Sequence, residues 1–505
     1  MRSPTRIILS ALVLCLIHRL ELYARPFLER STEEQLSEAL SIYLKSRGDS
    51  WIIATDPNER YETLFSSFML LELVKNGDFD LLFRVIDEAF EKEIDRQQGM
   101  GAAPSPPMGL PFLPRPLHVG ELGGLDGTSC RSCHFNGGPD GGGTGSAIAL
   151  FRGDGEHLSK SVQRDAPALM GAGYVELLAK QMSDSLQRRV KEIKATAQRN
   201  HVVYRGSLAT HGVNFGWVSA EPSGELILDE IEGINRDLIV RPFGWKGRHH
   251  RLVEIADESL QLHHGLQSLS RIHQYRSEAS RFLGEGTLAD PDQDGVIQEI
   301  YEGHPAALAA YMALLPAPIY AEPTQLSEML EWAEGRRWFE EVGCSSCHIP
   351  SLRVEPEPLK IKIEDSFSAE IEINPFKEGQ EPRLRRVDYS ADAKGSIPSG
   401  IPVFLFSDLK RHRMGTALSE SRSERLPNGH EVEADEWLTR PLWGLADSAP
   451  YLHDGRAQTI AEAIALHGGE AENSRRLYMT LSPSERGQLH LFLMSLSRAP
   501  TLLVE

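Results

Sequence analysis

The pentapeptide Cys344-Ser345-Ser346-Cys347-His348 constrains this chain more than any other stretch. Two thiols on one helical turn reach the two vinyl groups of a porphyrin, and the adjacent histidine is placed to ligate the iron. The same pattern occurs earlier as Cys130-Arg131-Ser132-Cys133-His134, so the two motifs use four of the chain's five cysteines. The sequence therefore predicts two covalently bound haem c groups, attached through Cys130, Cys133, Cys344 and Cys347, with His134 and His348 as iron ligands. The alternative is one zinc ion held by the four thiolates of the two CxxC pairs.

The charge and the first residues indicate the compartment and the partners. The 505 residues carry a formal net charge of −19, which argues against nucleic acid as a partner and favours a basic protein. Arg2 and Arg6 precede an apolar run at 7–17, which is too short to span a bilayer comfortably and suits a signal peptide. We expect 1–24 to be a signal peptide or an N-terminal membrane anchor. A periplasmic or exported protein is expected, because bacteria attach c-type haem outside the cytoplasm.

The apolar spacing predicts a mainly α protein. We expect a helical N-terminal extension over 25–105, then two tandem cytochrome-c-like haem domains over 106–320 and 321–505. The alternation in Leu359-Lys360-Ile361-Lys362-Ile363 and Glu370-Ile371-Glu372-Ile373 predicts strands, so 351–400 is expected to be a small β insertion in the second domain. Helices are expected over 165–200, 254–264, 325–342 and 483–497.

A second candidate metal site lies in an acidic loop. Asp290, Asp292 and Asp294 alternate before Gly295, with Glu299 four residues on. This pattern is typical of a calcium loop, although the loop is shorter than a full EF-hand. The alternative is an acidic turn that caps the next helix.

An internal repeat nominates further haem ligands. Phe243-Gly-Trp-Lys-Gly-Arg248 is followed by Glu258-Ser-Leu-Gln-Leu-His263-His264, and Tyr451-Leu-His-Asp-Gly-Arg456 is followed by Glu462-Ala-Ile-Ala-Leu-His467. A six-coordinate haem c needs a second axial ligand, usually Met or His. The repeat nominates His467 for the second haem and His263 or His264 for the first. Against this, a lone histidine is usually a core or surface residue.

Over about 118–498 the sequence resembles the bacterial di-haem cytochrome c peroxidases and, more closely, the related di-haem oxidoreductase family. The resemblance rests on both CxxCH motifs and on four further stretches. These are 243–248, Asp290-Pro-Asp-Gln-Asp-Gly295, Ser407-Asp408-Leu409 with His412-Arg-Met-Gly415, and Pro450-Tyr-Leu-His-Asp-Gly-Arg456.

The resemblance implies that the C-terminal haem takes electrons from a donor, such as a small cytochrome c, and passes them to a catalytic N-terminal haem. The substrate there is peroxide or another small molecule. Trp245 matches the tryptophan that relays electrons between the haems, with a packed core tryptophan as the alternative. His263 stands where the peroxidases have a catalytic glutamate, and is expected to be an acid/base or a displaceable iron ligand.

Two departures from the family bear on this function. His467 stands where the peroxidases have Met, which should lower the haem potential. The removable histidine ligand after the first motif has no counterpart in 135–156, where His201 and His211 are the nearest replacements. The sequence thus favours an exported di-haem peroxidase. A non-catalytic electron-transfer cytochrome with two six-coordinate haems is the alternative.

Overall fold

The computed structural model describes residues 130, 133–134, 149–151, 162–264, 266, 268–272, 300, 302–315, 317–318, 323, 325–364, 368–376 and 400–497. These residues all belong to one compact unit, Ile94–Glu505. The predicted leader at 1–24, the predicted extension at 25–105 and the acidic loop with Asp290, Asp292, Asp294 and Glu299 lie outside the described residues. In the described part of the chain, every helix is too short or too polar to cross a lipid bilayer.

The prediction of a mainly α protein is wrong. The described residues form six small antiparallel sheets beside their helices, five with two strands and one with three. Two cytochrome-c-like folds are not shown by these residues. The error arose because helical spacing is easy to recognise over long segments, whereas strands of two or three residues carry too little alternation to be recognised.

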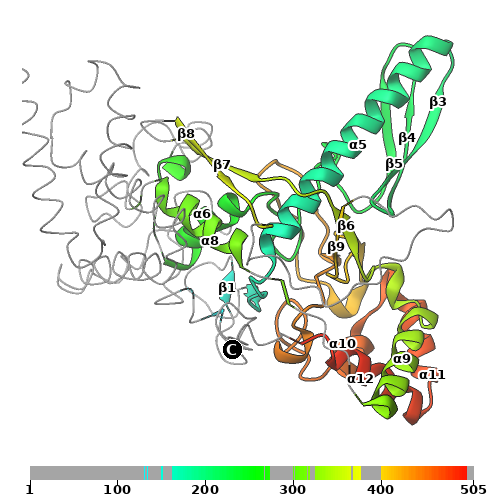
Figure 1. The fold of residues 1–505 in the computed structure, drawn as a ribbon. Helices are drawn as coiled ribbons and strands as arrows, with labels where there is room; N and C mark the ends of the chain where they lie inside the picture. The colour runs from blue at the N-terminus through cyan, green and yellow to red at the C-terminus, as the bar shows by residue number, and fades with distance from the viewer. Residues whose placement is uncertain are drawn as a thin grey trace, which may run out of the picture. The chain divides into compact units, whose positions relative to one another are not determined.

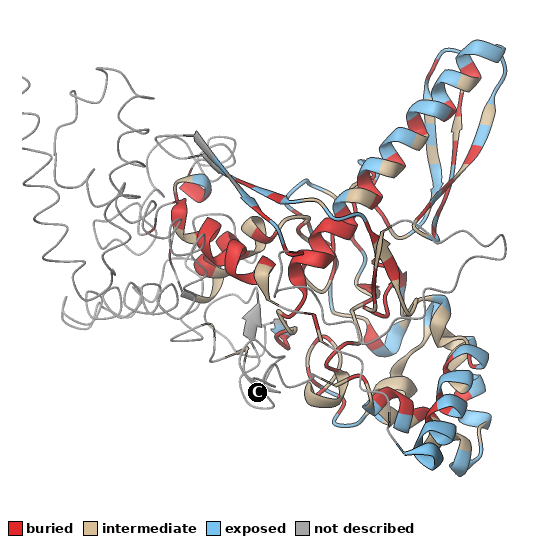
Figure 2. Ribbon diagram, viewed as in Figure 1, coloured by how far each residue is buried: buried red, intermediate tan, exposed pale blue. Residues whose placement is uncertain are grey.

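The three-stranded sheet and one long helix form a two-layer arm (Figure 1). Helix α5 (Ala172–Asn200) packs against strands β3 (Tyr204–Thr210) and β4 (Val213–Ala220), and β5 (Leu226–Ile231) pairs with β4. The first turns of α5 are buried throughout, while its second half buries one face only (Figure 2). That face carries the buried side chains of Leu186, Val190 and Ile193. Leu208 and Phe215 are buried side chains of the sheet.

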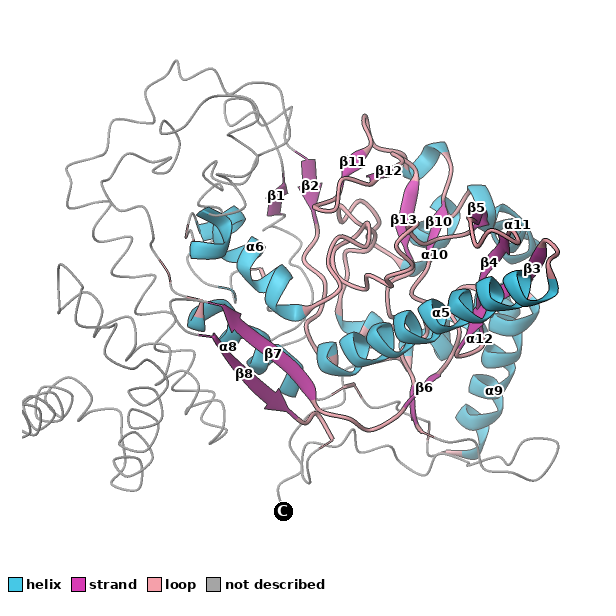
Figure 3. Cartoon of the chain, turned by 90° about the horizontal axis from the view of Figure 1, so that it is seen from above, coloured by secondary structure: helices cyan, strands magenta, loops and turns pink. Residues whose placement is uncertain are grey.

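Helices α6 (Leu252–His264) and α8 (Gly303–Leu314) pack against each other, and α8 also contacts a hairpin from the second half of the chain. This hairpin pairs β7 (Leu359–Glu364) with β8 (Ser368–Ile373), as the alternation in this stretch predicts (Figure 3). Nearby, the Tyr174 hydroxyl of α5 donates to the Pro375 carbonyl at 2.8 Å. The insertion therefore packs on the chain's own first half.

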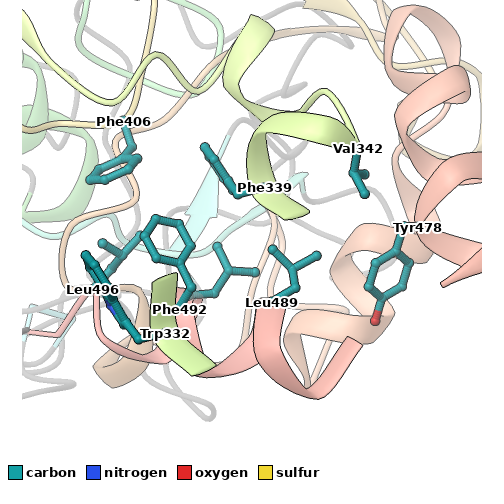
Figure 4. Packing of buried hydrophobic residues seen from close by; sticks show 9 residues of the cluster. Trp332, Phe339, Val342, Phe406, Tyr478, Leu489, Phe492 and Leu496 are labelled. Atoms are coloured by element: carbon teal, nitrogen blue, oxygen red, sulfur yellow. The ribbon is translucent and has the colours of Figure 1, made fainter. Parts of the chain in front are cut away.

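The C-terminal helices build the core that supports the second CxxCH motif. Helix α9 (Leu326–Glu341) packs along α12 (Pro483–Met494), with α10 (Ile460–Leu466) and α11 (Glu472–Thr480) beside them. Figure 4 shows the buried cluster that joins these helices: Trp332, Phe339, Val342, Phe406, Tyr478, Leu489, Phe492, Leu493 and Leu496. Each such side chain contributes about 1.5–3 kcal/mol on burial. Cys344 is packed against this cluster, so the core fixes the start of the motif.

Short strand pairs complete the described fold. They are β1 (Ala149–Phe151) with β2 (Val162–Arg164), β6 (Leu352–Val354) with β9 (Ile401–Val403), β10 (Arg411–Arg413) with β13 (Glu436–Leu438), and β11 (Glu424–Arg425) with β12 (Glu431–Val432). These pairs position the loops that carry the candidate site.

Candidate functional site

Both CxxCH motifs adopt the same single helical turn. In the second, the Cys344 carbonyl accepts the N–H groups of Cys347 at 3.4 Å and His348 at 2.9 Å. In the first, the Cys130 carbonyl accepts those of Cys133 at 3.3 Å and His134 at 3.0 Å. Such a turn carries both thiols and the histidine on one short stretch, as covalent haem attachment requires. The four cysteines do not gather into a metal-ligand cluster among the described residues, so nothing there supports the zinc alternative.

His348 is held as a neutral imidazole with a defined free nitrogen. Its Nδ1 lies 3.0 Å from the Phe406 carbonyl oxygen, and only a protonated Nδ1 can donate to that oxygen. Burial lowers the pKa of His348 to about 4, so the ring is neutral near pH 7. The lone pair is therefore on Nε2. This is the tautomer that a histidine needs to ligate a metal.

His467, at the end of another helix, also bonds its Nδ1 to a main-chain carbonyl. A capping box between Thr459 and Glu462 begins α10, and His467 is the residue that ends it. Its Nδ1 donates to the Ala463 carbonyl at 2.7 Å, and burial lowers its pKa. A positive charge on His467 would lower the pKa of His348, so the two rings interact electrostatically.

The two histidines and two cysteines fit a haem c. Cys344 and Cys347 lie on the turn before His348. Both imidazoles leave Nε2 available and bond Nδ1 to a main-chain carbonyl, as metal-ligating histidines usually do. The electrostatic interaction between His348 and His467 is consistent with the pairing that the repeat nominates. Their ligation of iron stays a prediction.

The structure describes fewer contacts around the first CxxCH motif than around the second. Cys130, Cys133 and His134 are half-buried, and His263 is half-buried near the end of α6. The side chain of His264 lies outside the description. Of the two alternative ligands, His201 ends α5 and His211 lies in the turn between β3 and β4. The choice among these residues stays a prediction.

An ionic cluster fixes the helix that carries His263. The Glu258 carboxylate of α6 accepts from Arg248 Nε at 2.6 and 2.8 Å, and His249 Nε2 lies 2.5 Å from it. Burial alone would raise the pKa of Glu258, but the charges of Arg248 and His249 hold it well below its usual value. The repeated Glu462 instead caps α10, so the two repeats use this residue differently.

The two copies of the internal repeat have the same backbone conformation. Phe243 and His249 form an antiparallel bridge, and so do Tyr451 and Ala457 six residues apart in the second copy. Positive φ angles recur at matched positions, +77° at Gly244 and +74° at Leu452, then +65° at Gly247 and +70° at Gly455. Both copies therefore close the same small loop, with Trp245 and His453 at the equivalent third position.

Trp245 and His453 meet at Asp165. The indole N–H of Trp245 donates to the Asp165 carbonyl at 2.8 Å, and the Asp165 N–H donates to the His453 carbonyl at 2.8 Å. The two rings pack edge to face with 6.4 Å between centroids. His453 also stacks on Trp437 at 3.8 Å. Trp245 is thus fixed in an aromatic group, whether or not it carries electrons.

Asp165 is an unusual member of this junction. It is 5% exposed, and its Oδ1 has no hydrogen-bond partner among the residues that the structure describes. Burial raises the pKa of Asp165 to about 7, with Asp454 adding to the effect and the Ala166 N–H opposing it. Sequence reasoning missed Asp165, His453 and Trp437. His453 carried a signal, since it occupies the place of Trp245 in the repeat.

A further polar group beside the second motif consists of Cys347, Asp408 and His412. His412 Nε2 lies 2.8 Å from Asp408 Oδ2, and its Nδ1 lies 2.7 Å from Glu470 Oε2. Burial would lower the pKa of His412, but hydrogen bonds to Asp408, Cys347 and Glu470 outweigh it and raise the pKa to about 12. Both ring nitrogens of His412 are thus engaged by carboxylates.

Comparison with known proteins supports the haem interpretation. Residues 389–496 match the family described as "Di-haem oxidoreductase, putative peroxidase", which confirms the resemblance over that part of the chain. No curated protein matches. A solved structure of Kuenenia stuttgartiensis hydrazine synthase, pressurised with 20 bar of xenon, is 16% identical with a TM-score of 0.22. That match covers 45% of this chain and 62% of the other, under two thirds of its length, and the likeness carries no information about fold or function.

Proposed function

We propose that this chain is an exported di-haem c-type oxidoreductase that works as a peroxidase. The observation that carries the proposal is the pair of half-buried histidines, His348 and His467, each with Nδ1 bonded to a main-chain carbonyl. His348 belongs to the second CxxCH turn, and residues 389–496, which include His467 but not that turn, match a family of di-haem oxidoreductases. The first motif repeats the turn, and so supports a second haem of the same kind.

The residues of the second motif hold and orient the group. Cys344 and Cys347 would form thioethers with the haem, and His348 and His467 would ligate its iron. A haem bound there supplies reversible one-electron chemistry. Phe406 and Ala463 keep the ligand tautomers fixed through their carbonyl oxygens, so neither histidine needs to rearrange when an electron enters or leaves.

Trp245 is proposed as the relay between the two haems. Its indole N–H is fixed on the Asp165 carbonyl, and the Arg440 guanidinium lies 5.6 Å from the ring centroid. A fixed aromatic ring shortens the distance that an electron must cross in one step. The ring does not have to move when the electron passes. Its edge-to-face contact with His453 adds a ring from the second repeat.

His263 is proposed as the acid/base at the first haem, where it would move a proton on a bound peroxide. The electron donor is proposed to be a small basic cytochrome c, because the chain carries a net charge of −19. The order of transfer is donor, C-terminal haem, Trp245, N-terminal haem, peroxide.

A non-catalytic electron-transfer cytochrome is the second candidate. Two features favour it: His348 and His467 would both ligate the second iron, and His263 or His264 would be available as a second ligand for the first. A carrier of this kind would exchange electrons with a partner but would not consume peroxide.

The test is a peroxide-dependent oxidation of reduced cytochrome c by the purified holoprotein. The peroxidase proposal predicts turnover, and predicts that His263→Ala lowers kcat by about 10²–10⁴-fold, the usual share of a general acid–base. His430→Ala is the matched control, because His430 lies in the turn between β11 and β12 and is not a candidate ligand. Absence of turnover in the wild-type protein, with both haems present, would leave the electron carrier.

A further inference from the structure

One short segment, 406–415, contacts the surroundings of both histidines of the second haem site. On the His348 side, the Phe406 carbonyl accepts the ring N–H, and the Ser407 N–H donates to the Ile349 carbonyl at 3.0 Å. On the other side, His412 reaches Glu470, three residues beyond His467. The segment therefore links the two axial ligands by a path outside the haem.

The link to the His467 side is a chain of charged hydrogen bonds. His412 is held between Asp408 Oδ2 at 2.8 Å and Glu470 Oε2 at 2.7 Å. The other carboxylate oxygen of Glu470 accepts the Arg413 N–H at 2.8 Å. Bonds with charged partners on both sides are stronger than neutral ones. Glu470 is thus bound at both oxygens to the segment 408–413.

Two glycines let the chains approach closely enough for this link. Gly469 has φ +55°, and a Cβ there would overlap with the Arg413 carbonyl. A Cβ on Gly468 would come within 3.0 Å of the Met414 carbonyl. The backbone directly after His467 is therefore pressed against 413–415. The His467 ring is also anchored by its hydrogen bond to the carbonyl of Ala463 in the preceding helix.

We propose that Glu470 and His412 are positioning residues that hold His467 on the haem iron. The inference rests on the proposed ligation by His348 and His467. With the pair intact, the loop 467–470 is fixed relative to the segment that also holds His348. Without it, His467 stays bonded to Ala463 but loses the anchor that sets its distance from His348, and the iron loses its sixth ligand.

Glu470→Ala in the full-length holoprotein tests the pair. The Glu470 side chain is 53% exposed, so its removal leaves no buried cavity. Glu472→Ala is the matched control, since Glu472 is two residues away and pairs with Arg475 of its own helix. Glu470→Gln is the graded variant, because a neutral amide keeps one weaker bond to His412. Far-UV circular dichroism and the melting temperature identify any variant that misfolds.

The readout is the spin state of the ferric haems, measured by electron paramagnetic resonance and absorption. We expect one additional high-spin haem per chain in Glu470→Ala, fewer in Glu470→Gln and none in Glu472→Ala. Added imidazole should restore the low-spin signal by occupying the vacated position. A Glu470→Ala protein that keeps the wild-type low-spin signal overturns the positioning role alone. A wild-type protein without a low-spin bis-histidine haem overturns both this role and the ligand assignment.

Discussion

Trp245 and His453 occupy the same position in two copies of one backbone loop, and their rings pack edge to face at 6.4 Å. Each copy comes from one half of the chain, and Asp165 joins them through its main-chain N–H and carbonyl. The internal repeat thus places an aromatic contact between the two halves, where a relay between two haems would be needed.

Trp245→Phe tests whether this contact carries electrons. We expect slower electron transfer between the haems after rapid reduction, measured by stopped-flow absorption. The lost indole hydrogen bond should also cost about 1–3 kcal/mol of stability, because the Asp165 carbonyl is left without that donor. Trp217→Phe is the control, since Trp217 lies exposed on β4. An unchanged inter-haem rate would mean that Trp245 is only a packed core residue.

Asp165→Asn should change the pH dependence of stability. The pKa of Asp165 is about 7 in the folded chain and 3.8 in an unfolded one, so ionisation is harder in the fold. The penalty is absent below the unfolded value, grows as the pH rises and is complete above about 7. Asparagine avoids it, and we expect a gain of up to about 4 kcal/mol at pH 8 that vanishes near pH 3.5.

Denaturant unfolding at several pH values measures this difference. Asp184→Asn is the control, because Asp184 is exposed on α5 and should change stability by less than about 0.5 kcal/mol at any pH. A gain of equal size at pH 3.5 and pH 8 would contradict the buried ionisation of Asp165.

Gly335 tests the packing beneath the second motif. A Cβ at Gly335 of α9 would overlap with the Gln488 carbonyl of α12, so Gly335→Ala should destabilise the fold by about 1–3 kcal/mol. Gly487→Ala is a matched helical control, because a Cβ there meets nothing within 4 Å. It should gain up to about 1 kcal/mol from helix propensity. Equal denaturation midpoints for the two variants would show that α9 and α12 do not pack this closely.

His467→Met should raise the reduction potential of one haem and keep it low-spin, because a thioether ligand favours the ferrous state. Redox titration followed by absorption measures both haems separately. His430→Met, in the turn between β11 and β12, should leave both potentials unchanged. Two unchanged potentials in His467→Met would exclude His467 as an iron ligand.

The sequence predicted the parts of the site that depend on spacing. The CxxCH turns, helices α9 and α12, the β7–β8 hairpin and the nomination of His467 beside His348 all come from local periodicity or from the repeat. It did not predict the role of Asp165. That role depends on a contact with Trp245, which is 80 residues away in the sequence. Nor did it predict that His412 binds Glu470, because neighbouring side chains from distant segments leave no mark on spacing.

The fold class was wrong for a related reason. Strands β10 and β13, for example, are three residues long and pair across a gap of more than twenty residues. Their stability comes from loops such as 406–415, which are fixed by side-chain hydrogen bonds and not by an alternating pattern. Ser407, for example, donates its hydroxyl to the Thr439 carbonyl at 2.6 Å and accepts the Leu409 N–H at 2.9 Å.

The most direct test is electron paramagnetic resonance of the purified holoprotein, oxidised and half-reduced, with and without hydrogen peroxide. A di-haem peroxidase predicts a low-spin signal from the haem of His348 and His467. It also predicts a high-spin signal from the first haem, present at the start or after half-reduction and lost when peroxide is added. Two low-spin signals that peroxide never changes would contradict the peroxidase, and a protein without a Soret band would contradict the haems themselves.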